Sequence, residues 1–166
     1  MEPRFAIEQI ATIATAVTAA IAAFWSVVPG SDRRWVLLPL VPLAVWLMTL
    51  GEACVRDWRL LGWAGLAPGT DWDCVWLAAV VGFVPAAAIV AMLRRGAPLV
   101  PRASLALAAV AVAAFANFVI RLHHPGDLGL TILAWHFGMV AVLACIAGLL
   151  ARHVLKWPRV EGLSRG

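Results

Sequence analysis

Five apolar blocks, separated by short charged turns, are the dominant feature of this sequence. They cover residues 5–28, 35–50, 74–93, 103–120 and 131–150. At about 1.5 Å per residue, a helix of about 20 residues crosses a hydrocarbon core of roughly 30 Å. The blocks follow one another too closely for a separate soluble domain to fit between them. We therefore predict an all-α fold, a polytopic membrane helix bundle of about five transmembrane helices, which forms a single membrane domain over residues 1–166.

The amino-acid composition leads to the same class of protein. The chain has 166 residues, of which 63% are hydrophobic and 13% charged, and its mean hydropathy is +0.91. A soluble domain of this length cannot hide so much apolar surface in its core, so we expect that surface to face lipid. The first block lacks a short hydrophobic region followed by a small-x-small cleavage site, and we expect it to stay in the membrane.

The second block and the segment after it are less regular. The block carries Pro39 and Pro42, which predict a kinked or irregular start. Residues 51–73 form the longest polar segment and contain Trp58, Trp63 and Trp72. Because tryptophan is enriched at the boundary between membrane and water, we expect this segment to lie on the interface.

The distribution of Lys and Arg predicts the orientation of a path that crosses the membrane five times. Thirteen such residues are present. Four fall on the side of the N-terminus: Arg4, Arg56, Arg59 and Arg121. The other nine fall on the side of the C-terminus: Arg33, Arg34, Arg94, Arg95, Arg102, Arg152, Lys156, Arg159 and Arg165. Since cytoplasmic loops carry the excess of positive charge, we predict a multi-pass inner-membrane protein with a cytoplasmic C-terminus.

Two classes of function are disfavoured by the motifs that the sequence lacks. It has no glycine-rich phosphate cradle, no nucleophile elbow and no paired carboxylates, so we predict that the protein is not an enzyme and has no catalytic residues. The basic turn around residues 94–102 is short and has no interleaved aromatic residues. Positive charge at the cytoplasmic face explains it better than direct binding of nucleic acid.

Several thiols and imidazoles fall near the predicted outer rim of the bundle: Cys54, Cys74, His123, His124 and His136. Such groups at one depth can bind a soft metal ion, and two thiols can form a disulfide in an oxidising compartment. Each residue also has a plain structural interpretation. Cys54 and Cys74 can be small apolar fillers at helix ends, and His123 and His124 can form an interfacial turn before Pro125. No ligand spacing identifies a particular metal.

Polar residues inside predicted spans form a second group of candidates. An ionisable side chain in the membrane is costly, which makes His136 and Glu8 functional candidates by default. His136 can instead donate a hydrogen bond to a neighbouring backbone carbonyl. Asn117 can join two helices by a hydrogen bond, and Cys145 lies in the middle of the fifth block, where we expect it to be inert.

An ordered set of short strings resembles the NrsF family of membrane anti-sigma factors. The strings are Phe5-Ala-Ile-Glu8, Leu93-Arg94-Arg95-Gly-Ala-Pro98-Leu-Val-Pro101, Leu122-His123-His124-Pro125, Trp135-His136 and Leu155-Lys156-Trp157. The resemblance covers essentially the whole chain from Phe5. It implies a bacterial inner-membrane protein that holds an extracytoplasmic-function sigma factor at the membrane until a stress signal arrives.

The resemblance also implies a sensor on the outer side, made of two cysteines that respond to oxidants or thiol-reactive metals. Cys74 matches the first cysteine. The second falls in a string that typically reads Leu-His-Cys-Pro in the family, and His124 occupies that position here. A thiol and an imidazole cannot form a disulfide, although they can share a soft metal ion. Cys54 is a substitute partner for Cys74.

The family usually has six spans, with a cytoplasmic segment and one further span before the Phe-x-x-Glu string. We therefore expect this chain to be a short form whose sigma factor contacts the turn that carries Arg94, Arg95 and Arg102, together with the C-terminal tail. A different class of function is a small redox, haem-binding or metal-binding membrane subunit, with His124 and His136 as ligands. A third is a small transporter or structural subunit, favoured by Pro39, Pro42 and Pro85.

Overall fold

The protein is described by a computed structural model that covers residues 3–66, 72–95, 100–123 and 138–154. All regular structure in these residues is helical. The described residues form five α-helices, α1 (Pro3–Trp25), α2 (Leu40–Leu61), α3 (Trp72–Arg95), α4 (Pro101–His123) and α6 (Gly138–Val154), and two 3-10 helices, η1 (Arg33–Leu37) and η2 (Gly62–Leu66). The predicted all-α bundle is therefore confirmed.

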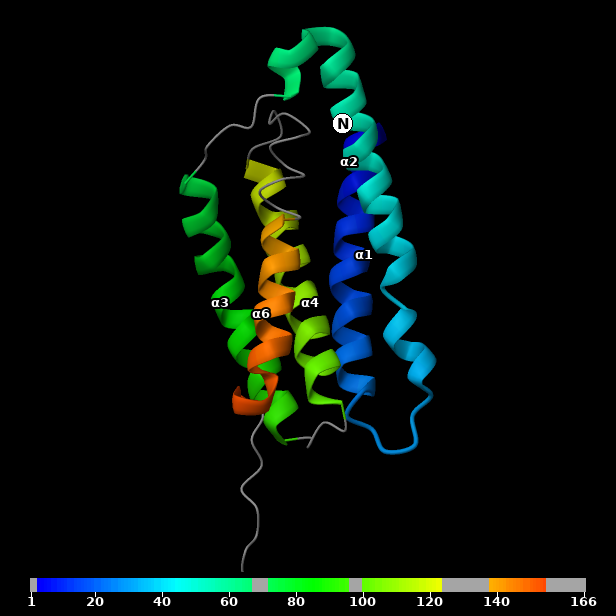
Figure 1. The fold of residues 1–166 in the computed structure, drawn as a ribbon, viewed down its shortest axis with the longest axis vertical. Coiled ribbons are helices and arrows are strands. Elements are labelled where there is room, and N and C mark those ends of the chain that lie inside the picture. Colours follow the sequence, from blue (N-terminus) through cyan, green and yellow to red (C-terminus); the bar gives the residue numbers. More distant parts are fainter. Residues whose placement is uncertain (1–2, 67–71, 96–99, 124–137, 155–166) are drawn as a thin grey trace, which may run out of the picture.

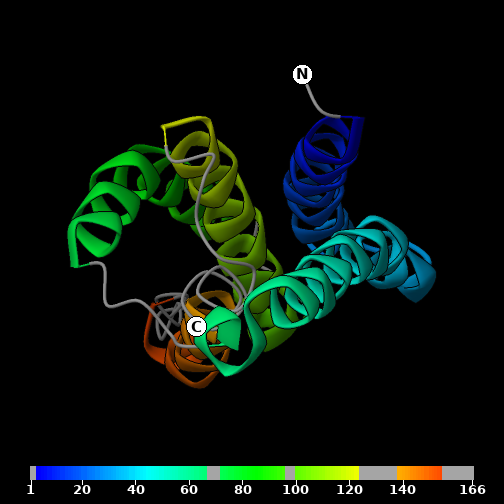
Figure 2. The same ribbon diagram turned by 90° about the horizontal axis from the view of Figure 1, so that it is seen from above.

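Successive helices run in opposite directions along the long axis of the molecule. In Figure 1, α1 runs from the upper end to the lower end, α2 returns, and α3, α4 and α6 continue the alternation. We call these the upper end, where the N-terminus lies, and the lower end, where α6 finishes. Seen from above, α4 lies between α1 on one side and α3 on the other (Figure 2), and it packs against α1, α3 and α6.

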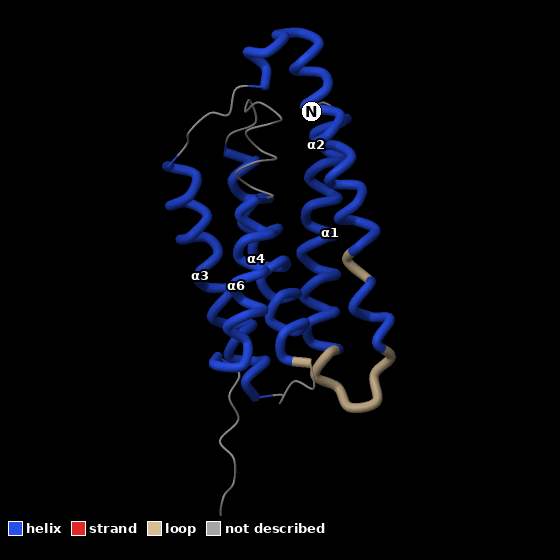
Figure 3. The backbone as a smooth tube through the Cα atoms, in the orientation of Figure 1, coloured by secondary structure: helices blue, strands red, loops and turns tan. Residues whose placement is uncertain are grey.

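The helix of the second apolar block, α2, begins and ends later than the predicted span over 35–50. The start of the block is irregular, as Pro39 and Pro42 predict, and consists of η1 followed by Pro39 as the N-cap of α2. The helix then continues through the polar residues to Leu61 and extends above the neighbouring helices (Figure 3). It ends at Gly62, whose φ of 60° favours glycine.

The turn between α1 and α2 is held by several local contacts. The Asp32 side chain caps η1 by accepting a hydrogen bond from the backbone N–H of Arg34 at 3.0 Å. The Ser31 hydroxyl donates to the backbone carbonyl of Trp25 at 2.8 Å. The indoles of Trp25 and Trp35 stack with centroids 5.0 Å apart and planes 7° from parallel. The turn therefore has a defined conformation in addition to connecting two helices.

The α1–α4 pair forms the centre of the bundle through small side chains. Ala19, Ala22 and Ala23 of α1 are completely buried, as is Ser104 of α4. The Ser26 and Ser104 hydroxyls share a hydrogen bond of 2.6 Å at the lower end. Small residues let two helix backbones approach closely, and close packing is what joins helices where lipid replaces water. The contact between α1 and α4 is thus built from small side chains that allow the two helices to approach closely.

The outer surface of the bundle is apolar. Large side chains on every described α-helix are exposed, among them Ile10 (66%), Met48 (75%), Phe83 (72%), Phe115 (37%) and Leu149 (74%). Exposed apolar surface on this scale is unusual for a soluble monomer. Within the described residues, three segments are long and apolar enough to cross a membrane, residues 3–25, 34–64 and 101–122. Their length and the exposed apolar surface are consistent with a helical membrane bundle.

The close approach of α3 to α4 depends on Gly82. A Cβ atom at this position would lie 3.2 Å from Val112 Cγ1 and 4.0 Å from Ala116 Cβ. Pro85, one turn later, cannot donate a backbone hydrogen bond to the preceding turn. The α3–α4 contact therefore has little room for a side chain at position 82. In the same part of α3, Pro85 removes one of the backbone hydrogen bonds that stabilise the helix.

We expect Gly82→Ile to push α3 away from α4 and to lower the free energy of unfolding by about 1–3 kcal/mol, as overpacking does in tight cores. The measurement is the midpoint of thermal unfolding in detergent micelles. Gly51→Ile in α2 is the matched control, because nothing lies within 4 Å of a Cβ added there. Equal midpoints for the two variants would contradict this account of the contact.

Candidate functional site

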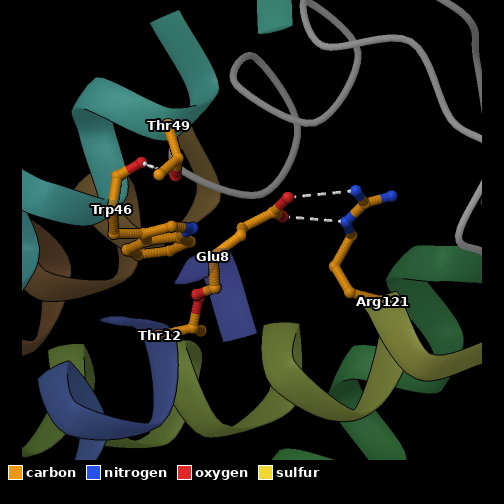
Figure 4. A network of polar contacts seen from close by, with 5 residues as sticks. All are labelled: Glu8, Thr12, Trp46, Thr49 and Arg121. Atoms are coloured by element: carbon orange, nitrogen blue, oxygen red, sulfur yellow. Dashed lines mark hydrogen bonds and ion pairs between the residues drawn. The ribbon is translucent and has the colours of Figure 1, made fainter. Parts of the chain in front are cut away.

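A buried ion pair joins the two central helices near the upper end. Arg121 Nε donates to Glu8 Oε1 at 2.9 Å, and Arg121 Nη2 donates to Glu8 Oε2 at 3.2 Å (Figure 4). The two side chains are only 7% and 10% exposed. The planar guanidinium and the carboxylate thus meet in the two-pronged geometry that gives the strongest hydrogen bonds between these groups.

The antiparallel arrangement of α1 and α4 explains how two residues 113 positions apart in the chain come together. Glu8 lies in the second turn of α1, and Arg121 lies in the last turn of α4. The negative group is therefore near a helix N-terminus and the positive group near a helix C-terminus. Both positions are favoured by the helix dipoles.

Neighbouring residues complete the surroundings of the pair. The Arg121 guanidinium lies over the ring of Phe5, 5.7 Å from its centroid, within the range of a cation–π contact. The Thr12 hydroxyl donates to the backbone carbonyl of Glu8 at 2.7 Å. From α2, the fully buried Trp46 packs in one cluster with Ala11 of α1, and it is drawn with the pair in Figure 4.

Two buried amides add to this polar region of the bundle. Gln9 follows Glu8 and is 6% exposed, and neither polar atom of its side chain has a hydrogen-bond partner. Asn117, which we expected to join two helices, is 3% exposed and lies one turn before Arg121 on α4. Polar groups are expensive to bury, so their concentration here marks the upper part of α1 and α4 as the most polar part of the described core.

The Glu8–Arg121 ion pair stabilises the bundle only when both residues are present. Removing either partner leaves an uncompensated charge in an apolar interior, which is far more costly than removing both. The pair therefore prevents α1 and α4 from sliding or rotating past each other, since any such movement separates the two charges. This gives Glu8, which sequence analysis flagged without a partner, a specific role in positioning two helices.

The predicted sensor residues lie partly within the described chain. Cys54 is a half-buried free thiol on α2. Cys145, which was not a sensor candidate, is an exposed free thiol on α6. Cys74 lies in the first turn of α3, and His123 is the last residue of α4. His124 and His136 lie outside the described residues. In the ranges that the structure describes, no group of three His, Cys, Asp or Glu residues could hold a metal ion.

The three arginines predicted to face a partner lie at the lower end and are exposed. Arg94 and Arg95 belong to the last turn of α3, and Arg102 belongs to the first turn of α4. They are thus at the opposite end of the bundle from Cys54 and from the first turn of α3 (Figure 1).

Arg121 was not predicted to lie in a buried site. It was counted among the charges of an outer turn, because the fourth apolar block was expected to end at residue 120. The helix instead continues to His123 and carries Arg121 into the bundle. The available signal was Glu8 itself, because a carboxylate inside a span needs a cationic or hydrogen-bonding partner at the same depth.

The fold and this buried pair define the class of the protein as a helical bundle of the membrane type, organised around a polar contact between two central helices. Comparison of the sequence with protein families gives a match to NrsF, described as negative regulator of sigma F, over residues 1–157. The chain belongs to the NrsF family. Neither the curated proteins nor the solved structures gave a match.

We expect Glu8→Leu and Arg121→Leu each to lower the free energy of unfolding by about 3–5 kcal/mol, because each leaves a buried charge without its partner. The double variant Glu8→Leu/Arg121→Leu should lose much less than the sum of the two single variants. Thermal unfolding in detergent micelles measures both effects.

The control for this pair is Arg4→Ala, which breaks the exposed Arg4–Glu52 ion pair, in which both side chains are 58% exposed. This change should cost less than about 1 kcal/mol. Additive losses in the Glu8 and Arg121 variants would show that the two residues act independently, contrary to the role assigned here.

Proposed function

We propose that this chain is an anti-sigma factor of a bacterial inner membrane, which holds an extracytoplasmic-function sigma factor at the cytoplasmic face. The observation that carries the proposal is the family match over residues 1–157, a range that includes all the described helices. The protein acts by binding its partner, without catalysis. The apolar outer surface and the length of the helices support a location within the lipid bilayer.

The charges at the two ends support an orientation with the lower end in the cytoplasm. Six arginines occur at the lower end of the described chain, at positions 33, 34, 94, 95, 102 and 152, and the upper end carries four, at positions 4, 56, 59 and 121. Cytoplasmic ends carry the larger number of Lys and Arg residues. The exposed Arg94, Arg95 and Arg102 then face the compartment in which a sigma factor is found.

The upper end would in that case be the sensing side. Three elements that carry sensor candidates meet this end, namely α2 with Cys54, the first turn of α3 with Cys74 and the last turn of α4 with His123. His124 follows directly in the sequence, and His136 precedes α6 by two residues. We propose that an oxidant joins Cys74 and Cys54 in a disulfide and is itself reduced, or that a thiol-reactive metal binds Cys74 with His124 or Cys54 as the second ligand. The resulting shift in helix packing releases the sigma factor.

We expect the affinity-tagged chain, isolated from membranes of its own host, to retain an extracytoplasmic-function sigma factor. Mass spectrometry of the bound proteins makes the identification. A tagged polytopic membrane protein of unrelated family, expressed at the same level, is the control for nonspecific retention. Absence of any sigma factor from the tagged chain would rule out the proposed function.

We expect treatment of these membranes with diamide or cadmium ions to release the retained sigma factor from the wild-type chain, and Cys74→Ser to prevent release because the reactive thiol is lost. The fraction of sigma factor in the supernatant is the readout. Cys145→Ser is the matched control, since Cys145 is an exposed thiol on α6 that the proposal does not involve. Unchanged release from Cys74→Ser would argue against Cys74 as the sensor.

A further inference from the structure

The lower end of the bundle presents a second basic turn, which sequence analysis did not assign to any partner. This turn joins α1 to α2 and contains Arg34, whose side chain is 89% exposed. On either side of it lie the stacked indoles of Trp25 and Trp35, which are 40% and 38% exposed. Tryptophan and arginine are among the residues that contribute most of the binding energy at protein interfaces. Here both kinds of side chain are exposed next to each other.

The first turn and the turn between α3 and α4 form one surface. Val36, which follows Trp35, packs against the same hydrophobic cluster as Leu93, which precedes Arg94. The Ser26–Ser104 hydrogen bond ties the end of α1 to the first turn of α4, two residues after Arg102. The stacked tryptophans and the arginines of both turns are therefore fixed relative to one another by the core beneath them.

The lower end carries more positive than negative charge. Among the described residues, six arginines lie there, and Asp32, which forms an ion pair with Arg34 at 3.8 Å, is the one carboxylate. At the upper end, Glu8, Glu52 and Asp57 each form an ion pair with one of the four arginines. The excess of arginine at the lower end favours an acidic partner over a neutral or basic one.

The defined conformation of the turn between α1 and α2 favours a protein partner over a lipid headgroup. Tryptophan and arginine also occur at membrane interfaces, where they act as separate anchors. Here the two indoles stack on each other, and the turn between them is held by the Asp32 cap and by the Ser31 hydrogen bond. A turn that only anchors the chain in lipid needs no such order, whereas a preorganised surface lowers the entropic cost of binding a protein.

We propose that Trp25, Arg34 and Trp35 form, together with Arg94, Arg95 and Arg102, a single docking surface for an acidic amphipathic segment of the sigma factor. Apolar side chains of that segment pack on the stacked indoles, and its carboxylates pair with the arginines of the two turns. This inference rests on the proposed function and extends the partner surface from one turn to two. The turn between α1 and α2 supplies the aromatic surface, and the turn between α3 and α4 supplies three further arginines.

The test uses the full chain in membranes and the sigma factor that copurifies with it. Arg34→Gln and Trp35→Ala should each reduce the amount of captured sigma factor about tenfold, the effect of losing a residue that is central to an interface. Arg59→Gln is the matched control, because Arg59 is an exposed arginine in the last turn of α2 at the opposite end. Thermal unfolding in detergent verifies that all variants are folded.

A photoreactive phenylalanine analogue at position 35 then identifies what touches the surface. Crosslinking to the sigma factor, with loss of capture in Arg34→Gln and Trp35→Ala, supports the docking surface. Crosslinking to lipid alone overturns it, and so does wild-type capture by both folded variants. In the last case the sigma factor still binds the chain, so the proposed function stands without the two-turn surface. If the wild-type chain captures no sigma factor, both proposals fail together.

Discussion

The Glu8–Arg121 pair is the interaction on which the arrangement of the other helices depends. It connects the two helices at the centre of the bundle, and α2, α3 and α6 are placed by their contacts with that pair of helices. Packing between small residues alone allows neighbouring helices to shift with little change in energy, because one alanine contact resembles the next. A two-pronged ion pair in an apolar environment has a single good geometry. It therefore selects one relative position of α1 and α4 from several that the alanine-rich faces permit.

The sequence contains most of the information about the fold and less about the site. Apolar blocks long enough to cross a bilayer predict helices in any arrangement, so the all-α bundle followed directly from them. The polar residues after Leu50 were harder to interpret, because tryptophans and charges at a membrane surface occur both in interfacial segments and in helices that extend beyond the lipid. Without Gly or Pro between Glu52 and Leu61, the backbone continues as a helix until Gly62. The partner of Glu8 depends on how α1 and α4 pack, which no local pattern in the sequence encodes.

The two ends of the central helix pair have contrasting chemistry. At the upper end, charged side chains satisfy one another inside the bundle, and a buried amide, Gln9, lies beside them. At the lower end the charges point outward, and hydroxyl groups and alanines hold the helices together. α3 extends between the ends, with Cys74 in its first turn and Arg94 and Arg95 in its last, and it touches mainly α4. A helix with one principal neighbour can change its tilt at lower cost than one enclosed on several sides.

The hydrogen bond between Ser26 and Ser104 has a further consequence when the composition of the surrounding solution changes. Either hydroxyl can be the donor, and neither carries a charge at any physiological pH. Buried away from water, the bond is insensitive to dissolved ions, whereas attraction between exposed charges weakens as ionic strength rises. The lower end can therefore keep its shape while the strength of its electrostatic attraction to other molecules varies with the salt concentration of the solution around it.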